Sequence, residues 1–271
     1  MVDKPHFLPT TPRGMWYRST ALIRLREQYG EPDITPAHRL DRDTAGVVVF
    51  VREPRFRGAY QMLFQERRTT KVYECVAPAK PITTPRYGTI ASLCSPRVFP
   101  LFRRSRIIKD RGILQAYERP GAVNAETMIE LGVCCQNQNS ARQADHGYLV
   151  YAANIQRNCT GISSVESATP YPYVCHSPLR TYVLHPRTGK THQLRVHMNS
   201  LGLPIVGDPM YPRSKERAYD DFSCPLELVA RSLEFIDPVT KEPRQFVSRI
   251  PLGQPFPTEA DGNMPLIPRC E

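Results

Sequence analysis

The segment His38–Gly46 reads HRLDRDTAG and leads directly into the apolar run Val47–Val51. Its Asp41 lies between the cations Arg39 and Arg42, shortly before a glycine and a strand that we expect to be buried. Nearby positive charge favours the ionised form of a carboxylate and offsets the cost of removing it from water. The pattern is typical of an ionised acid held in a cleft, although a surface cluster of ion pairs would have the same composition.

Helices are predicted on both sides of this segment. The first covers Ser19–Tyr29, with Ser19 or Thr20 as its N-cap and Gly30 at its C-terminal end. The second covers Phe56–Glu66, where apolar and aromatic residues recur at helical spacing.

Strands are predicted for much of the remaining chain. Lys71–Val76 alternates as a half-buried strand does, and the opening residues, rich in proline, are expected to be extended. Further strands are expected near Arg180–His185, Gln193–His197 and Leu233–Ile236. Because regular βαβ alternation is lacking, we expect an α+β fold with a mainly antiparallel central sheet flanked by helices and loops.

Composition bounds the class of protein. The 271 residues are enough for one substantial core, and the formal net charge is +10. An excess of cations favours polyanionic partners, because each cation placed on a phosphate releases counterions. Solubility alone would explain the charge equally well, so composition suggests nucleic acid without identifying it.

The cysteines and the apolar runs argue against several other classes. None of the eight cysteines has the C-x-x-C spacing of a zinc site, and no metal site is predicted. The N-terminus has no apolar signal stretch, and the longest apolar runs are too short for a membrane span. We therefore expect reduced thiols and a cytoplasmic protein that does not enter membranes.

Cations are densest over residues 97–119, where aromatic residues alternate with them. Cations beside aromatic rings suit a loop that binds phosphates and stacks on bases, although a solvated loop would look similar. The residues predicted to contact phosphates here are Arg103, Arg104, Arg106 and Lys109, with Phe102 beside them. Residues 132–178 are poorly patterned and are predicted to form a surface insertion.

The segment Arg187–His197 carries several polar side chains at close spacing. Read as a strand, it would present Gln193, Arg195 and His197 on one face and His192 on the other, an arrangement suited to binding an anion. A zinc site is not predicted, because His192 and His197 would lie on opposite faces of the strand and a third ligand is lacking. A phosphate-binding loop fails because its first glycine would fall at position 184, which is leucine.

In their order along the chain, these segments resemble the motifs of the RluA family of RNA pseudouridine synthases. The resemblance covers residues 1 to about 251, apart from the insertion at 132–178, and leaves 252–271 as a C-terminal tail. Members usually have another strand before the Lys-Pro motif, so the chain looks N-terminally short. The matching segments are Val2–Pro5, His38–Gly46, Lys71–Tyr73, Asn124–Thr127, Arg187–His197 and Gly207–Tyr211.

The resemblance implies an isomerase that converts specific uridines of rRNA or tRNA to pseudouridine without a cofactor. Asp41 would be the essential aspartate, Tyr73 would contact the target base, and Arg195 would pair with the aspartate. A monomer is expected. The residues implied to contact RNA are Arg39, Arg42, Arg103, Arg104, Arg106, Lys109, Lys190, His192 and Gln193.

Two other classes stay open at this point. Asp41 and Asp43 would share a face if they lay in a strand, as a glycosidase pair requires. Alternatively, the chain could be a non-catalytic RNA-binding protein of the same fold. The presence of all three implied catalytic residues argues against that second alternative.

Overall fold

A ten-stranded sheet runs through the computed structural model of the chain, which describes residues 1–12, 17–134, 178–218 and 220–252. The strand order is β1-β3-β11-β5-β10-β9-β7-β6, with β12 added to β11 and β8 added to β7. The strands are β1 (Val2–Lys4), β3 (Ala45–Val48), β5 (Thr69–Pro78), β6 (Thr89–Ser92), β7 (Leu101–Ile108), β8 (Tyr117–Arg119), β9 (Ala125–Cys134), β10 (Leu179–Pro186), β11 (Leu228–Ile236) and β12 (Pro243–Val247). A separate pair joins β2 (Thr35–Pro36) to β4 (Phe50–Val51).

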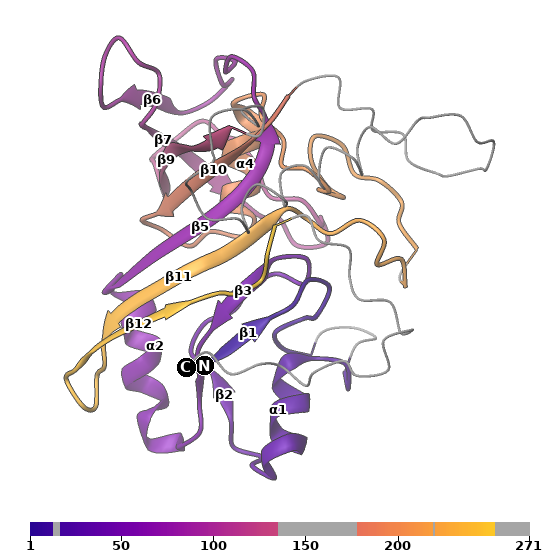
Figure 1. Cartoon of the computed structure of the whole chain (residues 1–271), viewed down its shortest axis with the longest axis vertical. Helices are drawn as coiled ribbons and strands as arrows, with labels where there is room; N and C mark the ends of the chain where they lie inside the picture. Colours follow the sequence, from indigo (N-terminus) through magenta and orange to yellow (C-terminus); the bar gives the residue numbers. More distant parts are fainter. Residues whose placement is uncertain (13–16, 135–177, 219, 253–271) are drawn as a thin grey trace, which may run out of the picture.

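All pairings in the large sheet are antiparallel except that of β11 with β3. Strand β11 lies between β3 and β5. Two strands from the first third of the sequence are therefore joined through a strand from the last third. The helices lie beside the sheet, with α1 and α2 at one end and α4 near β9 and β10 (Figure 1). This arrangement confirms the predicted α+β class and the mainly antiparallel sheet.

Gly46 is required by the parallel contact between β3 and β11. Its φ of +113° is unfavourable for other residues, and a Cβ atom there would lie 2.3 Å from the Ala230 carbonyl oxygen. The glycine that follows the Asp41 segment therefore allows β3 to approach β11 closely.

Both helices predicted before residue 70 are confirmed. Helix α1 covers Ala21–Tyr29; the Thr20 hydroxyl accepts a hydrogen bond from the Ile23 amide, and Gly30 ends the helix at a φ of +65°. Helix α2 covers Arg57–Gln65 and follows a short 3₁₀ turn, η1, over Pro54–Phe56.

The strand expected over Gln193–His197 is wrong, because these residues begin helix α4 (Gln193–Ser200). The helix rotates successive residues by about 100°, so Gln193 and His197 share one side and Arg195 lies on another. His192 precedes the helix in the left-handed conformation, with a φ of +53°.

The basic stretch is also not the loop that was expected. Its centre is β7, which pairs with β6, β8 and β9. Alternate β7 residues are buried, namely Leu101, Arg103, Ser105 and Ile107. The residues between them are half-buried or exposed, and Arg106 is exposed.

Apolar side chains from α4 and the residues after it cover one face of the sheet. Leu101, Ile129 and Leu184 lie on neighbouring strands in the same row and pack in one cluster with Met198 and Leu201. Tyr73 is opposite Leu184 on β5 and packs against the same cluster. Helix α4 and Tyr73 therefore lie on the same face of the sheet.

The predicted insertion and tail fall mostly outside the described residues. Strand β9 ends at Cys134 and β10 begins at Leu179, while residues 135–177 and 253–271 lie outside the description. Among the described residues, no helix combines the length and the apolar character needed to cross a membrane.

Candidate active site

The loop that carries Asp41 is held by side chains from the first ten residues. The Lys4 ammonium donates to the Arg42 carbonyl oxygen at 3.2 Å, and His6 Nδ1 donates to the Asp43 carbonyl oxygen at 2.8 Å. Both side chains are buried. Buried hydrogen bonds of this kind fix the loop backbone on both sides of Asp41.

Thr10 extends this support to the residue before Asp41. Its hydroxyl donates to the Leu40 carbonyl oxygen at 2.8 Å and accepts from the Leu40 amide at 3.1 Å. The Thr44 amide then donates to the Asp41 carbonyl oxygen at 3.2 Å, which closes a turn. The segment is therefore a fixed turn before β3. The alternative of a glycosidase pair required Asp41 and Asp43 to share a strand face, and they do not lie in a strand.

The two aspartates of this loop differ in exposure. Asp41 is half-buried, with 34% of its side chain exposed, whereas Asp43 is buried. Asp41 is thus the aspartate of this loop that a substrate can reach.

The charges of both aspartates act on Lys4. Burial lowers the pKa of the Lys4 ammonium to about 7, and the charges of Asp43 and Asp41 act in the opposite direction.

Tyr73 lies on β5, separated from the Asp41 loop by β11. Its ring packs against Leu40 and Ala230. Burial raises the pKa of the Tyr73 hydroxyl, and the charge of Asp41 raises it further. The tyrosine is therefore neutral, and its hydroxyl lies within electrostatic reach of Asp41.

Arg195 is buried and pairs with Asp208. Its Nε and Nη2 atoms donate to the two carboxylate oxygens of Asp208 at 2.9 and 2.6 Å. Asp208 Oδ1 also accepts from the Met210 and Tyr211 amides, which orients the carboxylate. The implied direct pairing with Asp41 is therefore corrected: among the described residues, the carboxylate that ion-pairs with Arg195 is Asp208.

Asp41 nevertheless acts on Arg195 at longer range. Burial lowers the pKa of the guanidinium, but the hydrogen bond and charge of Asp208, followed by the charges of Asp41 and Asp43, give a net increase. Arg195 therefore carries a permanent positive charge within electrostatic reach of Asp41.

His192 is the side chain of this segment that comes nearest to Asp41. Its Nε2 atom lies 3.8 Å from Asp41 Oδ2, and its Nδ1 atom lies 3.1 Å from the Tyr211 hydroxyl. Burial lowers the pKa of His192, with the charge of Asp41 opposing this change and that of Arg195 adding to it. Lys109 also lowers the pKa, which locates this predicted RNA contact beside the site.

Gln193 is buried and fully bonded, so its predicted contact with RNA is wrong. Its oxygen accepts from the Thr188 hydroxyl and the Lys190 amide, and its nitrogen donates to the Glu126 carbonyl and the Thr127 hydroxyl. The side chain instead fixes the turn before α4 against strand β9.

The predicted phosphate contact at Arg103 is also wrong. Its side chain is wholly buried and forms hydrogen bonds of 2.6 and 2.7 Å with both carboxylate oxygens of Glu118. Arg104 is partly exposed but pairs with Glu126 at 2.7 Å. Phe102 is opposite Met128 on β9, and the adjacent Leu101 belongs to the cross-strand row that contains Tyr73. Because successive residues of a strand point to opposite faces, Phe102 lies on the face away from Tyr73.

The remaining predicted RNA contacts are more accessible. Arg42 is half-buried, with its guanidinium carbon 6.0 Å from the centres of the Phe7 and Phe222 rings. The exposed members of the set are Arg39, Arg106, Lys109 and Lys190.

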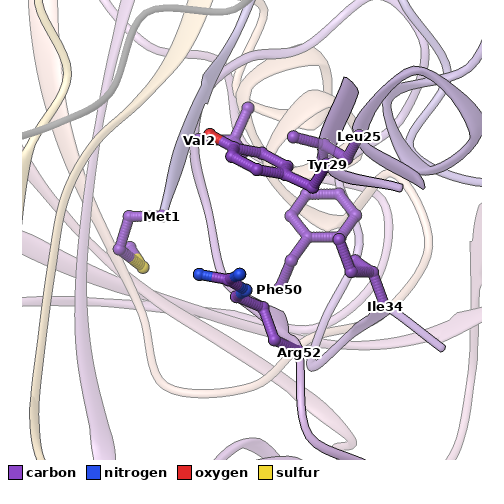
Figure 2. Close-up of a pocket in the computed structure, with 7 residues that line it drawn as sticks. All are labelled: Met1, Val2, Leu25, Tyr29, Ile34, Phe50 and Arg52. Atoms are coloured by element: carbon purple, nitrogen blue, oxygen red, sulfur yellow. The ribbon is translucent and has the colours of Figure 1, made fainter. Parts of the chain in front are cut away.

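A hollow of about 220 Å³ lies away from these residues, between β1, α1 and β4. Figure 2 shows the rings of Tyr29 and Phe50 and the guanidinium of Arg52 around it. None of the predicted site residues lines it. No group of three or more potential metal ligands occurs among the residues that the structure describes.

Interpretation of the sequence missed five residues that build the site: Lys4, His6, Thr10, Asp208 and Tyr211. Lys4 and the last two lie in segments that carry the family resemblance, so those motifs were the available signal. His6 has no such signal, because its role depends on the backbone of a loop 37 residues away.

One partly exposed carboxylate, flanked by a neutral tyrosine, an imidazole and a paired arginine, makes this region of the α+β fold the candidate active site. Residues 1–200 match the family model described as RNA pseudouridylate synthase. The chain therefore belongs to the RNA pseudouridylate synthase family, within its RluA group, and is an isomerase.

Named relatives agree with this assignment. The dual-specificity RNA pseudouridine synthase RluA of Vibrio vulnificus is 30% identical over 242 residues, covering 88% of this chain and 71% of that protein. The tRNA pseudouridine(31) synthase of Saccharomyces cerevisiae is 26% identical, covering 78% of this chain and 43% of that protein. The solved structure of human RNA pseudouridylate synthase domain containing 4 has the same fold, with a TM-score of 0.50, 21% identity and coverage of 92% and 84% of the two chains.

Proposed function

We propose that this enzyme converts specific uridines of structured tRNA or rRNA to pseudouridine, with Asp41 as the reacting carboxylate and without a cofactor. The observation that carries the proposal is the difference between the two aspartates of one loop. Asp41 is partly exposed beside Tyr73 and His192, whereas Asp43 is buried near Lys4. A site with one accessible carboxylate suits this isomerisation better than a glycosidase pair, which needs two.

The isomerisation breaks the bond between N1 and C1′ of uridine, turns the base and rejoins it through C5. It oxidises nothing and consumes no water, so its balance requires neither a nicotinamide nor a nucleoside triphosphate. One carboxylate can act as a nucleophile at C1′ or as a base at C2′. Both routes need Asp41 ionised and close to the ribose.

Arg195 and Tyr73 support these requirements in different ways. Arg195 supplies a permanent positive charge within electrostatic reach of Asp41. Tyr73 offers a ring on which a flipped uracil can stack and a hydroxyl for a hydrogen bond. Flipping a base costs a few kcal/mol, which such contacts offset.

The proposal of tRNA or rRNA rests on the names of the relatives and on the charge of the chain. One relative is named as a tRNA synthase and another as a dual-specificity RNA synthase. The net charge of +10 favours an RNA partner of either kind.

Tritium release tests the activity directly. RNA from cells that lack this enzyme, labelled with 5-tritiated uridine, is incubated with the purified protein in the presence of EDTA. We expect release at a defined set of uridines, which carbodiimide mapping then locates. If total RNA releases no tritium, the proposed activity is wrong; if EDTA alone abolishes release, only the proposed independence from metal is wrong.

A pair of substitutions tests the assignment of Asp41. Asp41→Asn is expected to lower turnover about a thousandfold or more, as removal of a reacting group does, with RNA affinity and melting temperature nearly unchanged. Asp43→Asn is the matched control and should retain measurable turnover. Comparable losses in both variants would favour a mechanism that uses two carboxylates.

A further inference from the structure

The contacts of the Tyr211 hydroxyl determine which nitrogen of His192 carries a proton. This hydroxyl donates its hydrogen to the Ala116 carbonyl oxygen at 2.6 Å, and a carbonyl oxygen can only accept. The hydroxyl must therefore accept from His192 Nδ1, 3.1 Å away. In the neutral ring, Nε2 is then an acceptor.

Two acceptors consequently face each other in the site. His192 Nε2 lies 3.8 Å from Asp41 Oδ2, and neither atom has a hydrogen-bond donor among the described residues. The ring is mostly buried, with 9% of the side chain exposed, so its orientation is fixed. The groups around it are Asp41, Arg195, Asp208 and Lys109, and burial is the largest influence and lowers its pKa.

The backbone of His192 is also unusual. A φ of +53° lies in the left-handed region, which is uncommon outside glycine. Such conformations often occur at ligand-binding sites because the surrounding structure maintains them for a purpose. Here the strained residue directs an imidazole nitrogen toward the exposed aspartate.

We propose that His192 Nε2 accepts a hydrogen bond from the ribose 2′-hydroxyl of the nucleotide on which Asp41 acts. The inference rests on the proposed function, in which Asp41 acts at C1′ or C2′. The 2′-hydroxyl is bonded to one of these carbons and adjacent to the other, whereas the N3–H donor of uracil lies across the base. The contact would make the site selective for ribose over deoxyribose, because the 2′-hydroxyl distinguishes RNA from DNA at a given position.

Nuclear magnetic resonance of protein labelled with ¹⁵N at its histidines tests the inference without requiring turnover. We expect His192 to be a single tautomer protonated at Nδ1. Uridine 5′-monophosphate should shift its Nε2 resonance, and 2′-deoxyuridine 5′-monophosphate should not. A proton on Nε2 in the free protein, or the same response to both nucleotides, would overturn the proposal, as would a response to neither.

Two variants provide the controls for that experiment. Asparagine tolerates the left-handed conformation, and its amide can still donate to Tyr211, so His192→Asn removes the Nε2 acceptor with little other change. Its spectrum also identifies the His192 resonances. Tyr211→Phe removes the hydroxyl that fixes the tautomer, so the preference for Nδ1 protonation should be lost.

The same contact predicts a measurable preference in RNA. Synthetic RNA containing a mapped target uridine is compared with the same RNA containing 2′-deoxyuridine at that position. Wild-type protein should bind the ribose form up to about tenfold more tightly, the contribution of one hydrogen bond, and His192→Asn should bind both equally within about twofold. A preference of unchanged size in the variant would contradict the proposal. If tritium release fails for every RNA while the mononucleotides are still distinguished, the proposed function is wrong and the ribose contact stands.

Discussion

On one side of helix α4, His192 and Arg195 lie within electrostatic reach of Asp41; on the other side, Gln193 and His197 face strand β9. We call these the site side and the sheet side. Each side carries a mostly buried imidazole, yet their hydrogen bonding differs. His197 is bonded at both ring nitrogens, to Thr127 and Ser105, whereas His192 is bonded to protein only at Nδ1 among the described residues.

The difference separates a structural polar group from a functional one. A buried group whose bonds are all made by the protein stabilises the fold, because removing one partner leaves the other unsatisfied. A group with an unused acceptor beside a partly exposed carboxylate is available to a bound molecule. Residue type alone would not distinguish the two histidines.

The largest expected effect concerns Arg195 on the site side. Arg195→Lys keeps a positive charge but loses the paired hydrogen bonds to Asp208, so turnover should fall about a hundredfold to a thousandfold. Arg103→Lys is the matched control, since Arg103 forms the same kind of buried pair with Glu118 away from Asp41. Its turnover should stay within about threefold of wild type. Steady-state kinetics of both variants, with melting temperatures, test this; equal losses of turnover would remove the distinction between the two pairs.

The next effect concerns stability on the sheet side. Gln193→Leu leaves buried partners without hydrogen bonds and should lower the free energy of unfolding by about 2–4 kcal/mol, with turnover below the melting transition nearly unchanged. Urea denaturation and kinetics measure the two quantities separately. A variant of normal stability that turns over slowly would mean that the sheet side takes part in the chemistry.

The pH dependence of stability gives a smaller effect of defined sign. Burial lowers the pKa of His197 to about 3 from an ordinary value of 6.5. Because the folded pKa is depressed, the stability contributed by neutral His197 is fully present above the ordinary value and is lost as the pH falls toward the folded one. The contribution should decrease by about 2 kcal/mol between about pH 7 and 5.

Comparison with a variant isolates this contribution of His197. His197→Leu should lose less stability than wild type over the same pH range, as measured by urea denaturation at each pH. His6 and His38, whose pKa values burial lowers to about 4 and about 3, change in the same direction in both proteins. Identical pH profiles would show that His197 does not resist protonation.

The smallest effect concerns Lys109, an exposed cation whose charge acts on His192. Lys109→Ala should reduce the slope of log affinity for RNA against log salt by about 0.7–0.9, the value of one phosphate contact. Melting temperature should barely change, because exposed charges contribute little to folding. Arg103→Lys again serves as the control, and its salt slope should equal that of wild type.

The sequence predicted the fold class and the helices before residue 70, because capping residues and periodicity are visible over short windows. The role of Asp41 stays a prediction that rests on local charge and on the family resemblance. The five residues Gln193–His197 are too few to distinguish a helical period from an alternating one. The partner of Arg195 could not be predicted either, since Asp208 follows a turn whose path depends on the packed sheet.

The basic stretch was misinterpreted for a related reason. Its alternation of Leu101, Arg103, Ser105 and Ile107 is that of a half-buried strand. The adjacent arginines concealed the pattern, because arginine is seldom buried unless it is paired. Glu118, which pairs with Arg103, becomes its neighbour only when β7 and β8 form.

The position of β11 has a consequence for how the protein is made. Asp41 and Tyr73 are translated early, but the strand that joins their parts of the sheet is translated much later: the end of β11 lies 236 − 41 = 195 positions after Asp41. At about 5–20 residues per second, a ribosome needs about 10–40 seconds to cover that length. Throughout this interval the nascent chain contains Asp41 and Tyr73 without the strand that lies between their parts of the sheet. We therefore expect the candidate site to be incomplete until β11 has been synthesised.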